Sequence, residues 1–488
     1  MATVPEGALM QRAAAGLAAT CIRLLGQVYG SRVVVLAGIG DNGGDALYAG
    51  AKLTSRGARV TAIQVGSHVH AGGASALLAA GGRLVAAADL AAPALIAESD
   101  LIIDGILGIG GRGGLREPAA TLAGLAARAS ADGAIVVATD LPSGVDADTG
   151  VVDGAAIGAD VTVTFGTVKP GLLIDPGASY AGTVEFVDIG LGPHLVASPG
   201  AVALQSADVG AMLPQPDAES NKYRRGVLGV LAGSEKYTGA AVLSVGGAIR
   251  GGAGMVRFVS ARHAVEVVRQ HWPEAVLTEI GPDDPVAAVE SAGRVQAWVA
   301  GPGLGTGDEA EALIGAVLAT SLPVLVDADG LTVLAGRNDL LSRPAGADTL
   351  ITPHAGELAR LLNADQDDIE AHRLAYVRRA AAELGVTVLL KGSTTVIASP
   401  DAADAVLVNA TGTPWLATAG SGDVLSGLAG ALLAQGVLPA RAAGAAAAFL
   451  HGLAGRLAAR DAPIGAADII AALPEAIRLV SAAAEGAA

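Results

Sequence analysis

Aromatic side chains and cysteine are both scarce in this sequence. Phe, Trp and Tyr make up only 3% of its 488 residues, so the core has to be built from Val, Leu, Ile and Ala. The single cysteine, Cys21, has no partner for an internal disulfide, which excludes a disulfide-stapled scaffold and fits a reducing compartment. We expect Cys21 to be a small buried apolar residue.

Positive charge is also in short supply. There are 31 Lys and Arg residues against 47 Asp and Glu residues, which gives a net charge of −16. A nucleic-acid or anionic-membrane partner needs a basic face, so the sequence predicts neither. A local basic pocket for a phosphorylated small molecule is compatible with these numbers.

Long hydrophobic runs are missing as well. The uncharged stretch 424–440 is interrupted by Gly, Gln and Pro and is shorter than the roughly 20 apolar residues of a membrane span. The N-terminus has no basic segment followed by a compact apolar block, so we expect no signal peptide. The sequence therefore predicts a cytoplasmic protein without a membrane partner.

What the chain does have is an alternation of short apolar strands with Ala-rich helices, which is typical of parallel α/β folds. The predicted strands of the first half are 33–37, 60–65, 101–104, 135–140, 161–165 and 183–187. Helices are predicted at 46–56 and 119–131. The 68 glycines follow no fixed period and fit many tight strand-to-helix turns. The first half is predicted to be a Rossmann-like, doubly wound sheet.

The alternation fails between residues 190 and 225, where four prolines interrupt it. It restarts with predicted strands at 227–231, 255–259, 297–300, 324–326, 350–352, 386–391, 395–398 and 406–408. No motif of the first half recurs, so we expect a fusion of two different α/β domains rather than a duplication. The predicted domains are residues 1–205 and 206–488.

The first predicted strand leads into a glycine-rich turn, Gly38-Ile-Gly-Asp-Asn-Gly-Gly-Asp45. Ligands of open α/β sheets bind beyond the carboxyl ends of strands. The turn is not a dinucleotide fingerprint, because Asp41 and Asp45 would repel a pyrophosphate. Their chemistry suits hydroxyl groups or a cation.

Two further strand ends carry matching groups. Asp104 ends one strand before a glycine loop, and Asp140 ends another, three residues before Ser143. Each carboxylate taken singly is compatible with a turn or capping role. Together, Asn42, Asp104 and Ser143 offer hard oxygen ligands, which favour a non-transition cation over zinc.

On these motifs, residues 8–190 resemble the NAD(P)H-hydrate epimerase family, whose loop reads Gly-Asn-Asn-Gly-Gly-Asp-Gly. Asp-Gly-x-x-Gly-x-Gly, Asp-x-Pro-Ser-Gly and Lys169-Pro-Gly match too. The resemblance implies K⁺ held by Asn42, Asp104 and Ser143, with Asp140 as acid/base. It also implies that the hydrated nucleotide contacts Asp41, Asn42, Gly43, Gly44, Asp45, Gly108, Ile109, Gly110, Gly111, Arg112, Gly113, Gly114 and Asp140. This chain departs from the family at Asp41, which replaces Asn, and at Ala46, which replaces Gly.

In the second half, Ala419-Gly-Ser-Gly422 leads Asp423 into the first turn of an apolar helix. Unpaired backbone N–H groups at a helix start, with the helix dipole, favour a phosphate. A carboxylate beside that site is placed to accept a proton from a hydroxyl being phosphorylated. A plain helix cap is the alternative.

Further polar segments follow other predicted strands of this half, on the same edge of the sheet. Lys391 is most simply a phosphate contact, and His354 is predicted to be functional rather than structural. Asp327 and Asp329 bind a cation or cap the following helix, and the sequence leaves both open. Phosphoryl transfer to a hydroxyl needs this combination of phosphate donors and a base.

The order of these motifs resembles the ribokinase-like, ADP-dependent NAD(P)H-hydrate dehydratase over residues 205–480. The resemblance implies ADP contacts at Lys391, Gly392, Ser393, Thr394, Thr395 and Gly422, with Mg²⁺. It implies contacts to the hydrate at Ala253, Gly303, His354 and Asp423.

The sequence thus predicts a bifunctional repair enzyme acting on NADHX and NADPHX, the hydrated forms of NADH and NADPH. The first half would interconvert the epimers at C6. The second would phosphorylate the C6 hydroxyl of the S form with ADP, Asp423 acting as base, and phosphate elimination would then yield NAD(P)H and AMP. Alternatives are a hydroxymethylpyrimidine-type kinase and a first half that only binds. The Ala-rich terminal helices predict a homo-oligomer.

Overall fold

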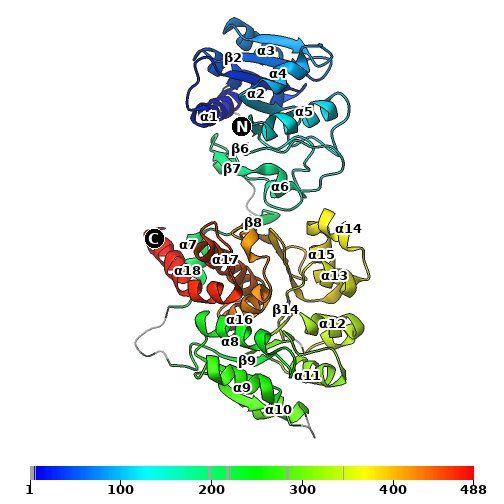
Figure 1. Cartoon of the computed structure of the whole chain (residues 1–488), viewed down its shortest axis with the longest axis vertical. Coiled ribbons are helices and arrows are strands. Elements are labelled where there is room, and N and C mark those ends of the chain that lie inside the picture. The colour runs from blue at the N-terminus through cyan, green and yellow to red at the C-terminus, as the bar shows by residue number, and fades with distance from the viewer. Residues whose placement is uncertain are drawn as a thin grey trace. The chain divides into compact units, whose positions relative to one another are not determined.

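The computed structural model describes residues 5, 7–195, 199–215, 219, 221–281, 285–344 and 346–487. The chain divides into two compact units, Met1–Ala197 and Ser198–Ala488 (Figure 1). Each unit has its own sheet, as two different α/β domains require.

The first unit is a seven-stranded parallel sheet in the order β3-β2-β1-β4-β5-β6-β7. Its strands are β1 (Arg32–Ala37), β2 (Arg59–Gln64), β3 (Arg83–Ala86), β4 (Leu101–Gly105), β5 (Ile135–Thr139), β6 (Val161–Phe165) and β7 (Thr183–Val187). The helices are α1 (Ala8–Leu25), α2 (Asp41–Thr54), α3 (Ala71–Ala79), α4 (Ala92–Ala97), α5 (Ala119–Ala131) and α6 (Gly177–Ala181), with short 3₁₀ turns η1 (Pro170–Leu172) and η2 (Gly192–His194). The strand order reverses direction between β1 and β4, so the loops after these strands diverge and leave a crevice.

Side chains of β1 alternate between two cores, which places helices on both faces of the sheet. Val33 and Val35 pack in the core formed with α1 and α2, whereas Val34 and Leu36 pack in the core formed with α4 and α5. All four are at most 2% exposed. The predicted doubly wound sheet is therefore confirmed, and its strands read as continuous apolar runs because both faces are covered.

The sequence placed the start of α2 too late. The helix begins at Asp41, five residues before the predicted 46, so the Asp41–Asp45 motif forms its first turn rather than a loop before it. A Cβ on Gly43 would lie 2.4 Å from the Gly38 carbonyl oxygen, so the helix start needs glycine to pack there. The sequence pattern did not predict this first turn of α2 because its glycines are poor helix formers in general.

The second unit is a ten-stranded sheet in the order β11-β10-β9-β12-β13-β14-β15-β16-β17-β8. Its strands are β8 (Ala201–Ala203), β9 (Val227–Leu231), β10 (Met255–Ser260), β11 (Val276–Glu279), β12 (Ala297–Ala300), β13 (Val324–Val326), β14 (Thr349–Ile351), β15 (Thr387–Leu390), β16 (Thr395–Ala398) and β17 (Val406–Asn409). Only β16 runs antiparallel to its neighbours. The helices are α7 (Ser206–Met212), α8 (Thr238–Arg250), α9 (Arg262–His271), α10 (Pro285–Ser291), α11 (Asp308–Leu318), α12 (Asp329–Gly336), α13 (Ala355–Leu362), α14 (Gln366–Ala371), α15 (Arg373–Leu384), α16 (Ser421–Ala434), α17 (Ala440–Ala459) and α18 (Ala466–Ala487), with 3₁₀ turns η3 (Asn338–Leu341) and η4 (Pro414–Leu416).

The boundary between the units lies eight residues before the predicted 205/206. Val202 of β8 pairs with Leu407 of β17, and α7 packs against α18, so both elements belong to the second unit. A three-residue strand next to prolines has no sequence period to reveal it, and only its pairing partner defines it. The strands β3 and β11 were likewise missed; each has four residues and is exposed at both ends.

Helices α8, α16, α17 and α18 share one large core with the sheet of the second unit. Figure 1 shows α11, α12 and α13 grouped on the other side of β9 and β14 from α17 and α18. Alanine and glycine let α8 and α16 approach closely: a Cβ on Gly427 would lie 1.9 Å from the Ser244 carbonyl oxygen. In the part of the chain that the structure describes, no helix is long and apolar enough to cross a membrane.

Candidate active sites

The switch point of the first sheet brings Asn42, Asp104 and Ser143 together around one loop. Ser143 Oγ lies 2.6 Å from Asp104 Oδ1, and the Ser143 N–H donates to Asp104 Oδ2 at 2.8 Å. Asn42 Nδ2 donates to the Leu107 carbonyl at 2.9 Å, and Ser143 Oγ lies 3.2 Å from the same carbonyl. The three predicted ligands thus share neighbours, although they come from the first turn of α2, the end of β4 and the loop after β5.

The carboxyl group of Asp104 is buried without a cationic side chain beside it. It is 0% exposed and has no ion-pair partner among the described residues. Burial raises the pKa of Asp104 to about 6, against the hydrogen bonds from Ser143 and the Ile106 N–H, which lower it. A buried carboxylate of this kind calls for a cation, and nearby amide, hydroxyl and carbonyl oxygens suit a hard one.

Asp140 is bound by a lysine from a different loop. Its Oδ1 accepts hydrogen bonds from Lys169 Nζ, the Phe165 N–H at 3.0 Å and the Thr164 hydroxyl at 3.2 Å. Lys169 is only 8% exposed and also donates to the Phe165 carbonyl at 3.0 Å. Asp140 adopts a left-handed backbone (φ 65°), which is strained for a residue other than glycine and is typical of functional sites.

A cavity of about 570 Å³ opens beside this ion pair. Asp41, Asp45, Ile109, Asp140 and Lys169 are among its lining residues, so α2 and the loops after β4 and β5 converge on it. The predicted contact residue Arg112 is instead paired with Asp146 at 2.5 Å and with Asp148 at 3.2 Å, on an exposed part of the glycine loop. Lys169 was noticed in the sequence only as part of a motif, and its bond to Asp140 depends on the fold.

In the second unit, α16 begins at Ser421 and carries Asp423 in its first turn, as predicted. Gly420 precedes the helix in a left-handed conformation (φ 85°), which turns the chain into the helix axis. Burial raises the pKa of Asp423 to about 7; the charge of Asp327 raises it further and Lys391 opposes the shift. A carboxylate with a pKa near 7 is suited to act as a general base at neutral pH.

Lys391 lies at the same helix start. Its Nζ is 2.8 Å from Asp327 Oδ1 and 3.7 Å from Glu357 Oε2, and a Cβ on Gly422 would be 3.5 Å from it. Burial would lower the pKa of Lys391, but the charges of Asp327 and Glu357 raise it, so it stays an ammonium. This places a fixed positive charge next to the N–H groups of α16.

The structure places the Asp327 and Asp329 side chains in different surroundings. Asp327 is 1% exposed, and its carboxylate is engaged by Lys391 and, at 2.5 Å, by Ser426 Oγ, so it does not cap α12. Asp329 Oδ2 accepts from the Gly305 N–H at 2.9 Å and holds the loop after β12. Among the described residues, no group of three His, Cys, Asp or Glu side chains could hold a metal ion.

His354 caps helix α13. Its Nδ1 accepts from the Gly356 and Glu357 N–H groups at 3.0 and 3.3 Å, and Glu357 Oε2 accepts from the His354 N–H at 2.8 Å. The side chain is nevertheless 56% exposed and lines a cavity of about 760 Å³. A structural cap and a ligand contact are thus compatible at this residue.

The same cavity also contains Lys391, Gly392, Ser393, Thr395 and Gly422 of the predicted nucleotide contacts, whereas Thr394 is buried. It further contains His451 of α17, which belongs to no motif of the sequence. His451 Nε2 lies 3.0 Å from the Ser421 carbonyl and 3.2 Å from its hydroxyl. Burial lowers the pKa of His451 to about 4, so it is neutral and ties α17 to the first turn of α16. A lone histidine in an Ala-rich helix offers no sequence signal for this role.

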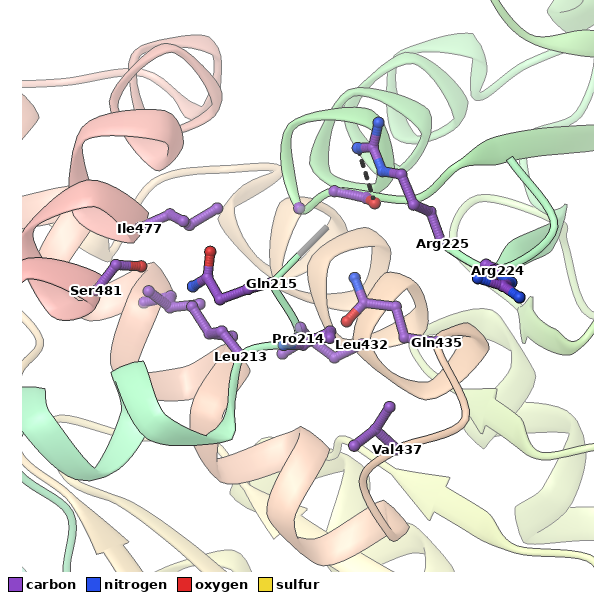
Figure 2. A pocket seen from close by; sticks show the side chains of 13 residues that line it. Leu213, Pro214, Gln215, Arg224, Arg225, Leu432, Gln435, Val437, Ile477 and Ser481 are labelled. Atoms are coloured by element: carbon purple, nitrogen blue, oxygen red, sulfur yellow. Dashed lines mark hydrogen bonds between the residues drawn. The ribbon is translucent and has the colours of Figure 1, made fainter. Parts of the chain in front are cut away.

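The structure does not bring Ala253 together with the other predicted hydrate contacts. Gly303, His354 and Asp423 follow the carboxyl ends of strands, whereas Ala253 lies between α8 and the start of β10. It adjoins Gly251 and Gly252, which line a separate cavity of about 250 Å³ near the amino ends of β9 and β10. Figure 2 shows Arg225 there, donating to the Gly252 carbonyl at 3.3 Å.

At the edge of the sheet where the strands have their carboxyl ends, close packing requires glycine at position 303. It has φ 64°, and a Cβ there would lie 2.8 Å from the Ala240 Cβ and 3.0 Å from the Tyr237 Cβ. The loop after β12 therefore presses against the start of α8, and glycine keeps its backbone open to a ligand.

Comparisons with known proteins agree with both units. A family described as NAD(P)H-hydrate dehydratase matches residues 228–475, and one described as YjeF-related protein N-terminus matches residues 6–171. The bifunctional NAD(P)H-hydrate repair enzyme of Mycobacterium leprae is 47% identical over 466 residues, covering 94% of this chain and 91% of the relative. That of Moorella thermoacetica is 34% identical over 506 residues, covering 97% and 93%.

Among solved structures, the ADP/ATP-dependent NAD(P)H-hydrate dehydratase of Bacillus subtilis, co-crystallised with ATP and Mg²⁺, is 29% identical. The match has a TM-score of 0.51 and covers 57% of this chain and 97% of that one. A ribokinase-like superfamily protein of Enterococcus faecalis is 25% identical with a TM-score of 0.52. The matches to the Mycobacterium leprae and Moorella thermoacetica enzymes, which cover 94% and 97% of this chain, extend over both of its units. The chain belongs to the bifunctional NAD(P)H-hydrate repair enzyme family.

Proposed function

We propose that this chain repairs hydrated nicotinamide cofactors at two sites. The first unit epimerises the R and S forms of NAD(P)H hydrate. The second dehydrates the S form at the expense of ADP and releases NAD(P)H, AMP and phosphate. The observation that carries this proposal is that Asp423 and the Lys391 ammonium both lie at the start of α16, which places a base beside a phosphate site.

In the second unit, the β-phosphate of ADP would bind the first-turn N–H groups of α16, near Gly422, and the Lys391 ammonium. Asp423 would accept the proton of the C6 hydroxyl as its oxygen attacks the phosphorus. The phosphorylated C6 oxygen is a good leaving group, so loss of phosphate together with a C5 proton restores the dihydropyridine ring. The cavity by Gly392, Ser393 and Thr395 would hold the rest of the nucleotide.

Mg²⁺ would accompany the nucleotide in this unit. Mg²⁺ is commonly held by one or two carboxylates together with substrate phosphates, rather than by an all-protein cage. The absence of a three-ligand cluster in the described residues fits that mode. The hydrate would lie by Gly303 and His354; Ala253, at the other edge, is not included.

In the first unit, K⁺ would be held by Asn42, Asp104 and Ser143, where it would compensate the buried Asp104 charge. The hydrate would occupy the cavity lined by Asp41, Asp45, Ile109 and Asp140. Gly43, Gly44 and the other residues of the 108–114 loop, apart from Arg112, would contact it as the family resemblance implies. Asp140 would act on the substrate as an acid/base group. The epimerase would comprise residues 1–197 and the dehydratase residues 198–488, each in its own unit.

The test separates the two sites within one protein. Asp423→Ala should abolish ADP-dependent recovery of absorbance near 340 nm from aged NADH, while epimer equilibration measured by chromatography continues. Asp140→Ala should do the reverse, slowing equilibration while the S form is still dehydrated. Parallel loss of both activities in a folded Asp423→Ala protein would contradict the two-site assignment.

A further inference from the structure

Two carboxyl groups face the cavity of the first unit in opposite electrostatic environments. Asp140 receives three hydrogen bonds, one of them from the buried ammonium of Lys169. Hydrogen bonds and a cation favour the charged form of a carboxyl group. These contacts suit Asp140 to the role of proton acceptor.

Asp45 is the opposite case. Its Oδ1 is buried and has no hydrogen-bond partner in the described part of the chain. Burial, followed by the charges of Asp140 and Asp41, raises the pKa of Asp45 to about 8. An unpartnered buried oxygen is costly unless a ligand completes it, so the carboxyl is both neutral and available to a bound molecule.

The charged groups around Asp45 explain why it keeps its proton. Asp41 lies on the same helix, and Asp140 faces it from the loop after β5. Lys169 lines the same cavity, but its ammonium is taken by Asp140. Two histidines also lie nearby: His194 of η2 lines the cavity, and His70 packs on Gly44 and accepts the Gly73 N–H.

We propose that Asp45 is the proton donor and Asp140 the proton acceptor of the epimerase site. This assignment rests on the proposed function, since it gives Asp45 a chemical role where the family resemblance implies only contact with substrate. Both residues line one cavity, so a single bound ring can reach both.

The chemistry needs two such groups. C6 of the hydrate carries a hydroxyl and is bonded to ring N1, so the centre is a hemiaminal. Asp140 takes the hydroxyl proton, the C6–N1 bond breaks with its electron pair going to N1, and Asp45 protonates N1. The product is an open-chain aldehyde and an enamine N–H. Rotation about C5–C6 presents the other face of the aldehyde, and closure returns the protons to Asp45 and to the new C6 hydroxyl.

Ring opening fits the surroundings of Asp45 and Asp140 because each carboxyl group ends the reaction in the protonation state in which it began. Neutral Asp45 and ionised Asp140 serve both directions of the reaction without a resetting step. An alternative that expels the C6 hydroxyl as water would move a proton from one carboxyl to the other at every turnover. That alternative would end each turnover with Asp140 protonated beside Lys169 and with Asp45 charged, the reverse of the starting state.

The experiment uses the full chain without ADP, so that the dehydratase is silent, and follows one purified epimer by chromatography. Asp45→Asn should lower kcat by about 100-fold or more with KM within a factor of about 3, as expected for loss of a proton donor. The exposed Asp132→Asn, at the end of α5, is the matched control and should retain wild-type rates. ADP-dependent dehydration by Asp45→Asn should remain at the wild-type level, which shows that the protein is folded.

Two outcomes would overturn the assignment. One is an Asp45→Asn protein with normal kcat and raised KM, since Asp45 would then only bind substrate. The other is incorporation of one solvent oxygen per turnover in ¹⁸O-labelled water, since ring opening keeps the C6 oxygen. A folded wild-type protein that dehydrates but does not epimerise would instead refute the proposed function of the first unit.

Discussion

Lys391 Nζ lies 2.8 Å from Asp327 Oδ1 in the second unit, and Ser426 Oγ of α16 donates to the other oxygen of the same carboxylate. Asp327 follows β13, Lys391 follows β15, and Ser426 lies one helical turn after Asp423. The three side chains thus fix the ammonium at the start of α16. These contacts hold the Lys391 ammonium in one position, although the Lys-Gly-Ser-Thr-Thr segment that carries it consists mostly of small residues.

Replacing this lysine should affect only one of the two activities. Lys391→Met should lower the dehydratase kcat by about 100-fold or more, because the charge on the transferred phosphate loses a fixed counter-charge. Lys391→Arg keeps the charge and should retain a larger share of the rate. Steady-state kinetics with ADP measures the effect, and unchanged epimer equilibration controls for folding. A wild-type rate in Lys391→Met would show that the ammonium does not touch the reacting phosphate.

The two sites should respond to pH in opposite ways. Asp423 must be ionised to act as a base, and its pKa is raised to about 7, so dehydration should rise through that pH. Asp45 must be protonated to act as a donor, and its pKa is raised to about 8, so epimerisation should fall above that pH. Rates of both reactions measured from pH 5.5 to 9.5 on the same preparation test this directly. If both rates rose with pH, or both fell, the assigned protonation states of Asp423 and Asp45 would be contradicted.

Asp45 should also reduce stability at alkaline pH. Its pKa is higher in the folded chain than the ordinary 3.8, so folding favours the neutral form. The cost of the charged form is absent well below pH 4, grows between about pH 4 and 8, and is complete above it. Asp45→Asn should therefore raise the free energy of unfolding at pH 8 by more than about 1 kcal/mol. Hydrogen exchange of α2 amides at pH 8 and at pH 4 should show a gain only at the higher pH.

Loss of His451 should loosen the phosphate site. Its neutral ring joins α17 to the Ser421 carbonyl, and His451→Leu leaves that buried carbonyl without the bond. We expect a stability loss of about 1–3 kcal/mol and a fall in dehydratase kcat, because the first turn of α16 loses its anchor. Thermal unfolding and ADP-dependent turnover measure the two effects. His451→Gln, which can still donate a hydrogen bond, should recover part of both.

Potassium should matter to the first unit alone. Asp104 is fully buried and its hydrogen bonds come from neutral groups, so exchange of K⁺ for choline should slow epimerisation severalfold or more. Titrating KCl at constant ionic strength provides the measurement. The dehydration rate under the same conditions, with Mg²⁺ constant, is the control. Epimerisation that is independent of K⁺ would argue that Asp104 is structural.

The succession of strands and the polar residues at their ends were readable from the sequence because they depend on local patterns. Continuous apolar runs marked buried strands such as β9 and β12 at their observed bounds. Glycine-rich junctions marked the carboxyl edge, where parallel strands must end together. Asp104, Asp140 and Asp423 could be singled out because each directly follows such a run or opens such a helix.

The partners of these residues depend on contacts between segments far apart in the chain. Lys169 reaches Asp140 across 29 residues, Ser426 reaches Asp327 across 99, and His451 reaches Ser421 across 30. No spacing in the sequence predicts such contacts, because they form only when the assembled sheet brings distant loops together. Burial, which raises the pKa of Asp45, Asp104 and Asp423, is likewise a property of the packed fold. The sequence by itself determined which strand ends carry polar groups, and the tertiary structure decided which of those groups are charged, neutral or held in place.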